Sequence, residues 1–348
     1  MFNNLADLNF SAQILAKEAV RRGYKLTFLA KTSSDTLSPI ILAQKTGRQI
    51  IFKSSKTGLD SAFSGILSDD KITTYDLLSR HNLPIPPTFI LRRDEISEDL
   101  SCKTSSDFSQ VFRESSPRIV ELSDFFRENF PVVVKPSNTD HGNGVTIAIS
   151  DKKTLREAIF YACENSINAD ILIQKQVTGE EFRFIVLNGK TIFVANRVPP
   201  FVIGDGAKTL RELIEIKNTD PRRGEKYDSP LTKINLDEVA HFLGREKLDE
   251  IPQQNEKIEL LKTSNLSRGG EPINCTQKVS RELCEIAEKA ARLCGIGLAG
   301  VDIMTKNISS SKGFIIEVND SPGLRVATGE IDIAKIIFDE LEKITIKI

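Results

Sequence analysis

The stretch GFIIEVNDSPGLR, residues 313–325, constrains this chain most, because it predicts a strand that runs into a tight turn. Glu317 and Asn319 are two residues apart, so their side chains share one face of the strand. A carboxylate and an amide oxygen placed in this way form half of a hard-oxygen site for Mg²⁺. Asp302 interrupts an otherwise apolar predicted strand and offers a second carboxylate. With Arg325 beyond the turn, the pattern has the parts of a phosphoryl-transfer site.

Composition narrows the class of protein. The chain has 348 residues, enough for two or three small domains with real cores. Its net charge of −1 gives no basic bias toward nucleic acid or an anionic membrane. No apolar run is long enough to span a bilayer, and the N-terminus has no secretory apolar region. The five cysteines include no CxxC pair, which favours reduced thiols in a cytoplasmic protein.

The first 68 residues predict a small α/β lobe. Apolar residues recur at helical spacing over residues 11–22, and Gly23 provides a natural helix end. A strand at 25–30 follows, and residues 37–57 continue with strand and helix segments. The lobe contains no GxGxxG motif, so a dinucleotide site has no support there.

Residues 83–118 predict little regular structure. The prolines of LPIPPTFIL (83–91) force the chain to be extended. Residues 92–118 are rich in serine and charge and have no clean periodicity. We predict a loosely structured insertion there and slightly favour a disordered loop as the simpler interpretation.

Two lysines stand at the ends of predicted elements, and the second of them lies where a phosphate group could be bound. Lys71 follows an acidic pair that suits the start of a helix. Lys135 ends the apolar strand FPVVVKP and precedes SNTDHGNGV (137–145), whose glycines let backbone N–H groups turn toward an anion. The alternative is a simple hairpin turn with a solvent-exposed lysine, and the loop taken alone does not decide between the two interpretations.

The next region combines a hairpin with clusters of positive charge. Asn188–Gly189 joins two alternating runs and is a strong hairpin signal. Glu181 and Arg183 share one face of the first run. The loop at 220–234 is dense in cations, which predicts either a solvated charge run or a surface for an acidic substrate. Residues 279–294 form the clearest helical pattern in the chain.

Several motifs in one order resemble the ATP-grasp superfamily: DDK (69–71), VVVKP with its glycine loop (132–145), GEEFR (179–183), GVDIM (300–304) and EVNDSPG (317–323). The likeness is greatest to the ATP-grasp part of cyanophycin synthetases, through GDGAKTLRELIEIKNTDPRRGEKYDSPLTKI, LKTSNLSRGGEPIN and EVNDSPGLR. Bifunctional glutathione synthetases and D-alanine–D-alanine ligases are similar at lower resolution. The resemblance implies an α/β (α+β) ATP-grasp fold over residues 69–348, in which 69–178 and 179–348 clamp ATP, preceded by the lobe at 1–68.

The resemblance also implies a reaction and a set of site residues. ATP would phosphorylate a carboxylate of an amino acid or short peptide, and an amine would attack the acyl phosphate to give an amide. The residues implied to bind ATP are Lys71, Lys135, His141, Gly142, Gly144, Gln174, Lys175, Val177 and Glu181. The implied ligands of Mg²⁺ or Mn²⁺, with two ions expected, are Asp302, Glu317 and Asn319. Arg325, Lys135 and Arg268 would act in catalysis, and the expected substrate-binding cations are Arg183, Arg222, Arg223, Lys233 and Arg268.

Three positions depart from the patterns of these relatives. Gly300 stands where many D-alanine–D-alanine ligases have arginine, and Gln174 stands where relatives are often acidic. Arg268 replaces a small polar residue of the cyanophycin-type pattern. An added cation could change which acid or amine is accepted, so poly-aspartate and arginine are not transferred as substrates.

Two other classes of function remain open. One is an ATP-grasp phosphotransferase that stops at a phosphorylated small molecule, and the other is a nucleotide-binding protein without ligase turnover. The intact lysines and metal ligands speak against the second, and the cationic loop at 220–234 speaks against the first. Relatives commonly form homodimers or homotetramers, but no stretch of this sequence identifies an interface.

Overall fold

The chain folds into two compact units. The computed structural model describes residues 5, 8–29, 39–97, 111, 118–139, 142–225, 229–327 and 329–344. The first unit comprises residues 1–64, 180–312 and 318–348, and the second comprises 65–179 and 313–317. Within the described ranges, no helix combines the length and apolar character needed to cross a bilayer.

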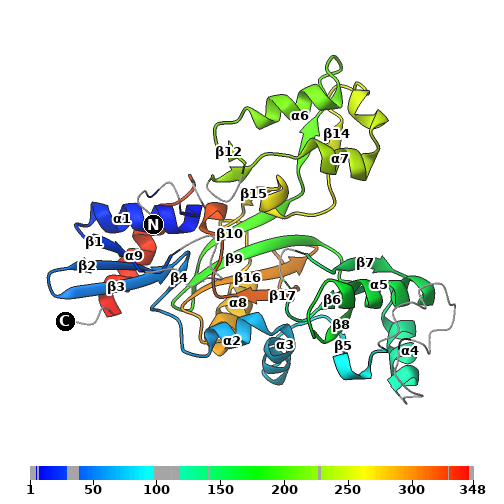
Figure 1. Ribbon diagram of the computed structural model, residues 1–348, viewed down its shortest axis with the longest axis horizontal. Coiled ribbons are helices and arrows are strands. Elements are labelled where there is room, and N and C mark those ends of the chain that lie inside the picture. Colours follow the sequence, from blue (N-terminus) through cyan, green and yellow to red (C-terminus); the bar gives the residue numbers. More distant parts are fainter. Residues whose placement is uncertain are drawn as a thin grey trace. The chain divides into compact units, whose positions relative to one another are not determined.

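The centre of the first unit is a sheet in which β15, β10, β9 and β16 are neighbours in that order, and most of β17 belongs to the second unit. The bounds are β9 Glu180–Leu187, β10 Lys190–Val198, β15 Glu271–Asn274, β16 Leu298–Thr305 and β17 Phe314–Asn319. Strands β9 and β10 form the predicted hairpin, and positive φ angles of 47° at Asn188 and 71° at Gly189 allow its tight turn. Helix α8 (Arg281–Leu293) contacts β9, β10 and β16 and corresponds to the helix predicted at 279–294 (Figure 1).

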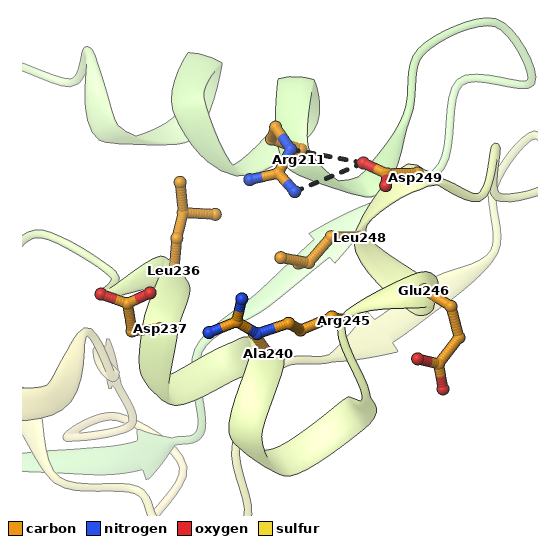
Figure 2. Close-up of a pocket in the computed structure, with 8 residues that line it drawn as sticks. All are labelled: Arg211, Leu236, Asp237, Ala240, Arg245, Glu246, Leu248 and Asp249. Carbon is orange, nitrogen blue, oxygen red and sulfur yellow. Dashed lines mark hydrogen bonds and ion pairs between the residues drawn. The ribbon is translucent and has the colours of Figure 1, made fainter.

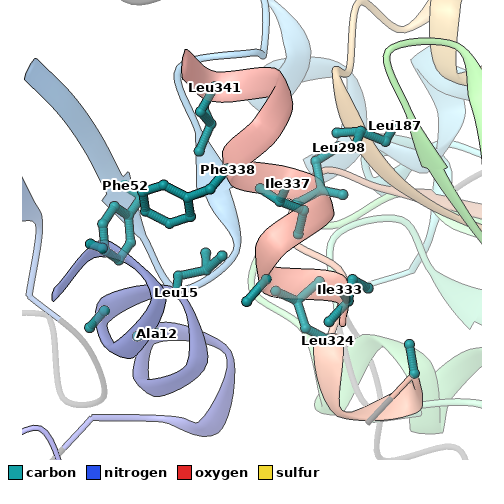
Figure 3. Close-up of a cluster of buried hydrophobic side chains, with 14 of the residues drawn as sticks. Ala12, Leu15, Phe52, Leu187, Leu298, Leu324, Ile333, Ile337, Phe338 and Leu341 are labelled. Atoms are coloured by element: carbon teal, nitrogen blue, oxygen red, sulfur yellow. The ribbon is translucent and has the colours of Figure 1, made fainter. Parts of the chain in front are cut away.

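The N-terminal residues pack against the C-terminal helix in this same unit. A four-stranded antiparallel sheet, β1-β2-β3-β4, lies beside helices α1 and α9. In Figure 3, Leu15, Phe52 and Phe338 meet in one apolar cluster, which continues to Leu187 and Leu298 of the central sheet. The bounds are α1 Phe10–Arg21, β1 Lys25–Phe28, β2 Ile41–Lys45, β3 Arg48–Lys53, β4 Lys56–Thr57 and α9 Ile333–Ile344. Residues 1–64 thus share a core with later parts of the chain, and the domain boundary at 68/69 stays a prediction.

A smaller part of the first unit has its own apolar cluster. It includes Val202, Leu210, Ile214 and Val239, which come from a strand pair and two helices. The elements are β11 Phe201–Ile203, α6 Leu210–Asn218, β12 Arg223–Gly224, β13 Leu231–Thr232, α7 Leu236–Leu243, η4 Glu246–Asp249, β14 Lys257–Glu259 and η5 Leu266–Arg268. Strands β11 and β14 pair with each other, as do β12 and β13. The turn after β17 ends in η6 (Leu324–Ala327).

The second unit is a four-stranded antiparallel sheet with the order β5-β8-β6-β7. One face packs against helices α4 and α5 in a continuous core. The bounds are α2 Ser64–Asp69, α3 Lys71–Arg80, β5 Thr88–Leu91, η2 Arg93–Glu95, α4 Arg118–Asn129, β6 Val132–Pro136, β7 Thr146–Ile149, α5 Lys152–Glu164 and β8 Ile171–Lys175. Most of the insertion predicted at 92–118 lies outside the described residues, although Ile96 and Val111 are described and are buried in this core.

Candidate active site

The sheet of the second unit has one apolar and one polar face. Val132, Val134 and Ile173 point into the core beneath helices α4 and α5. Val133 pairs with Gln174 across β6 and β8, so Lys135 and Gln174 lie on the opposite face. Both are buried, with exposed fractions of 8% and 4%. Two predicted ATP-binding residues therefore lie together on the polar face of this sheet, to which β5 also belongs.

Lys135 is buried without a counter-charge among the described residues. Its Nζ donates to the Tyr75 Oη at 3.0 Å and lies 5.2 Å from the centre of that ring. The Tyr75 hydroxyl in turn donates to the Ile316 carbonyl oxygen. No carboxylate of the described residues lies within ion-pair distance of this ammonium. A buried, unpaired charge is costly, so this position fits a bound anion such as a phosphate group.

Lys71 connects three segments of the same unit. It is the first residue of α3, whose N-cap is Asp70. Its Nζ donates to the Thr139 carbonyl oxygen at 2.8 Å and lies 3.4 Å from the Glu317 Oε1. Lys71 thus ties the start of the glycine loop to β17. A phosphate bound here would compete with Glu317 for the same ammonium.

The loop between β6 and β7 joins two paired antiparallel strands and is therefore a hairpin loop. Gly142 and Gly144 have φ angles of 81° and 71°, which favour glycine. A Cβ on Gly144 would also lie 2.8 Å from the Pro136 Cγ. The simpler interpretation was right about the hairpin and wrong about the lysine, since Lys135 is buried. His141, predicted to cover the phosphates, lies outside the described residues.

The remaining residues predicted to contact adenine and ribose divide between the two units. Gln174 donates from Nε2 to the Thr88 Oγ1 at 2.8 Å, which fixes its amide on the polar face. Lys175 is exposed and Val177 is half-buried, just after β8. Glu181 belongs to the first unit, and its contacts are with residues of that unit.

The polar cluster of the first unit lies on one face of the central sheet. Asp302 of β16 faces Arg183 of β9, and Glu181 of β9 faces Arg197 of β10. Arg183 donates to both carboxylate oxygens of Asp302, through Nε and, at 2.7 Å, through Nη2. The Arg197 Nη1 lies 3.2 Å from Asp302 and 2.9 Å from Glu181. The network thus links a predicted metal ligand, Asp302, with a predicted ATP-binding residue, Glu181, and a predicted substrate-binding cation, Arg183.

The two carboxylates of this network have different electrostatic environments. Burial disfavours ionised Asp302, but the charges of Arg183 and Arg197 outweigh it and lower the pKa of that carboxyl. Burial raises the pKa of Glu181, and the neighbouring negative charge of Asp302 acts in the same direction. The Ser264 hydroxyl donates to the Glu181 Oε2 at 2.7 Å. Asp302 is therefore stabilised as an anion, and Glu181 is the easier of the two to protonate.

Sequence reasoning missed Arg197. A hairpin closed at Asn188–Gly189 without irregularity would place Asn196 opposite Glu181. The structure has a bulge between Thr191 and Phe193, which shifts the register by one residue and brings Arg197 opposite Glu181 instead. No turn residue or motif in this stretch predicts that bulge.

The predicted metal ligands come from both units. Asp302 and Asn319 belong to the first, and Glu317 to the second. The Asn319 Nδ2 donates to the Gly300 carbonyl oxygen at 3.4 Å. No group of three or more His, Cys, Asp or Glu side chains suited to a metal occurs among the described residues. The oxygen donors suit Mg²⁺ in kind, but an ion at Asp302 would have to replace contacts of its arginines.

Arg325 and Arg223 meet through one residue of β13. The Arg325 Nη1 donates to the Thr232 Oγ1 at 3.1 Å, and the Arg223 Nη1 donates to the Thr232 carbonyl oxygen at 2.6 Å. Arg223 is also paired with Glu271, and only 1% of its side chain is exposed. These contacts favour a packing role for Arg223, whereas Arg325 lies in η6, six residues after Asn319.

Three other predicted cations lie in exposed local pairs. Arg222 pairs with Asp220 at 2.7 Å, and Arg268 pairs with Glu238 at 2.8 Å. Lys233 pairs with Glu225. Exposed pairs of this kind are weak, so their cations can be recruited by a ligand at little cost. Their assignment to substrate binding stays a prediction.

A surface pocket of about 320 Å³ lies elsewhere, between α6, α7 and η4 (Figure 2). Arg211 is held by Asp249 on one side, and the apolar side chains of Leu236 and Leu248 contribute to the lining. None of the predicted site residues lines this pocket.

Comparisons with known proteins find one family match and several similar proteins. Residues 261–341 match a family described as the RimK-like ATP-grasp domain. The glutathione biosynthesis bifunctional protein GshAB of Listeria monocytogenes is 32% identical over 329 residues, which cover 92% of this chain and 39% of that protein. Cyanophycin synthetase of Crocosphaera subtropica is 39% identical over 204 residues, which cover 57% of this chain and 23% of that protein.

A solved structure extends the likeness to the fold. The bifunctional glutathione synthetase of Pasteurella multocida superposes with a TM-score of 0.69 at 21% identity, over 97% of this chain and 45% of that one. The chain thus spans less than half the length of each of these three relatives. The predicted fold is confirmed: the chain has the ATP-grasp fold, and its residues 261–341 match the RimK-like ATP-grasp domain.

Proposed function

We propose that this protein is an ATP-dependent carboxylate–amine ligase that acts on an amino acid or short peptide. A substrate carboxylate oxygen attacks the γ-phosphorus of ATP and displaces ADP, which leaves an acyl phosphate. An amine then attacks the acyl carbon, the C–O bond to phosphate breaks, and the amine loses a proton. The products are an amide, ADP and phosphate.

The observation that carries this proposal is the buried ammonium of Lys135. It lies on the polar face of β6 beside buried Gln174, and its described partner is a neutral phenol. A cation in this setting favours an anionic ligand, while Gln174 offers amide groups to a base edge. The similarity to proteins named cyanophycin synthetase and glutathione biosynthesis bifunctional protein supports the ligase reaction.

The other residues take the roles that their positions allow. Lys71 would bind a phosphate, and Arg325 would stabilise the charge that develops on the acyl phosphate. Bound Mg²⁺ or Mn²⁺, as two ions held by Asp302, Glu317 and Asn319, would neutralise negative charge on the ATP phosphates. Arg183 and Arg197 hold the Asp302 carboxylate ionised and oriented.

Substrate carboxylates would be recruited by the exposed arginines and lysine. Arg222, Lys233 and Arg268 lie in weak surface pairs and can exchange their partners for a substrate. Arg223 is excluded from this proposal, because its guanidinium already holds Glu271 and two carbonyl oxygens. We also propose a cytoplasmic location, on the basis of composition alone.

The test is an ADP-release assay with pools of amino acids and dipeptides, followed by mass spectrometry of the products. We expect ADP release that depends on both an acid and an amine, with a product whose mass is the sum of the masses of the acid and the amine minus one water. ADP release with a phosphorylated small molecule and no amide would establish the phosphotransferase alternative instead. Nucleotide binding without ADP release from any pool would contradict both enzymes.

A further inference from the structure

One segment of the N-terminal part, residues 55–61, contacts both ends of the region that carries the predicted metal ligands. The hydroxyl oxygens of Ser55 and Ser321 are 3.1 Å apart. Lys56 forms an ion pair with Asp320, whose side chain is 9% exposed. These contacts reach the turn that begins directly after Asn319, and all of them lie within the first unit.

The same turn is fixed at its other end. The Leu324 backbone N–H donates to the Ser11 Oγ at 3.0 Å, in a buried setting. Asn319 immediately precedes the Lys56–Asp320 contact, and Arg325 immediately follows the Ser11–Leu324 contact. The proposed metal ligand and the proposed catalytic cation therefore lie just outside two anchor points supplied by the first 64 residues.

The segment also anchors the start of β16, the strand that carries Asp302. The Asp60 Oδ1 accepts from the backbone N–H of Gly297 at 2.9 Å and of Leu298 at 3.3 Å. A Cβ on Gly297 would lie only 2.4 Å from the Leu59 Cβ, so the two segments are so close that only glycine fits at position 297. The segment thus holds β16 and the turn after β17 through separate contacts.

We propose that residues 55–61, with Ser11, are a positioning element that holds Asn319 and Arg325 in the geometry needed to bind metal-loaded nucleotide. This inference rests on the proposed function. Asp320 and the Ser11–Leu324 hydrogen bond are buried, and buried polar groups have few alternative partners, so these contacts fix the turn. Small displacements of groups that contact reacting phosphates are costly, and a well-held turn avoids them.

The experiment measures ADP and ATP affinity of the full chain by calorimetry, with Mg²⁺ and with a chelator. Lys56→Met and Asp320→Asn each remove the ion pair, and the double variant tests whether they act together. Lys335→Met is the control, since Lys335 is about as exposed as Lys56 and its ion pair, with Asp339, lies within α9 rather than at the turn. Thermal melts of every variant check folding.

We expect Lys56→Met to reduce the Mg²⁺-dependent gain in affinity by about tenfold, the usual scale for a charged contact to a buried group. Affinity without Mg²⁺ should stay within about twofold. Asp320→Asn should behave alike, the double variant should be no worse than either, and Lys56→Arg should recover most of the gain. Lys335→Met should resemble the wild type.

An unchanged Mg²⁺-dependent gain in Lys56→Met would overturn the positioning role. So would equal losses with and without Mg²⁺, which indicate general damage to the fold. If Lys56→Met does not fold, Ser55→Ala decides between the same two outcomes. A wild-type chain that shows the gain yet forms no amide would overturn the proposed ligase function and leave this test intact.

Discussion

The polar faces of the two sheets differ in whether their buried charge is paired. On β6 of the second unit, Lys135 is buried beside a phenol and no described carboxylate neutralises it. On β16 of the first unit, Asp302 is buried between Arg183 and Arg197, which occupy both of its oxygens. The first site has a buried cation without a charged partner among the described residues, and the second has a buried carboxylate that is paired with two arginines.

This difference separates a binding residue from one that also supports the fold. An unpaired buried charge lowers stability unless a ligand compensates it, so we propose that Lys135 is buried in order to bind an anion. A buried pair is costly to break from one side, because the remaining charge loses its partner. A substitution that disturbs Asp302 is therefore expected to affect both the stability of the sheet and any metal binding. A substitution of Lys135 is expected to affect ligand binding alone.

The largest expected effect is that of Glu317→Gln on turnover. This substitution removes the charge of a proposed metal ligand that lies 3.4 Å from the Lys71 ammonium. We expect the rate of ADP release to fall by about 1,000-fold or more, with the melting temperature unchanged. Retained activity would mean that the metal assignment is wrong.

Arg183→Met tests the paired side of the comparison through stability. It leaves buried Asp302 with only Arg197, so we expect the free energy of unfolding to fall by about 3 kcal/mol in urea titrations. Arg222→Met is the control, because it breaks an exposed pair with Asp220 and should cost less than about 1 kcal/mol. Equal losses in the two variants would remove the distinction.

Lys135→Met tests the unpaired side. The methionine keeps most of the apolar stem and removes the charge, so we expect nucleotide affinity to fall about 10- to 100-fold. The melting temperature should stay unchanged or rise, because Tyr75 keeps its bond to the Ile316 carbonyl. A clear loss of stability would show that the ammonium is structural after all.

The smallest effect concerns pH. The arginines lower the pKa of Asp302, so the pair contributes stability that is present above about pH 4 and is lost as pH falls through the lowered value. The stability difference between wild type and Arg183→Met should therefore be constant from about pH 5 to 8 and should shrink below about pH 4. A difference that persists unchanged under strong acid would argue against an ionised Asp302.

The comparison also shows how far sequence reasoning reached. The turn signal at Asn188–Gly189 and the apolar stripe of α8 are local, and both were confirmed. The position of Arg197 was missed, because a bulge that no motif marks reset the strand register. The burial of Arg223 was missed for a related reason, since a run of charges in a loop carries no information about which member turns inward.

The sequence by itself determined which chemical groups the proposed site has to offer. Hard oxygens at Asp302, Glu317 and Asn319, the lysine at 135 and a fixed cation at Arg325 follow from local spacing and from strand periodicity, and the family resemblance adds Lys71. Only the tertiary structure decided which of these charges are already paired. Partners such as Arg183 with Asp302, or Lys56 with Asp320, are more than one hundred residues apart, and only strand register and chain packing bring them together.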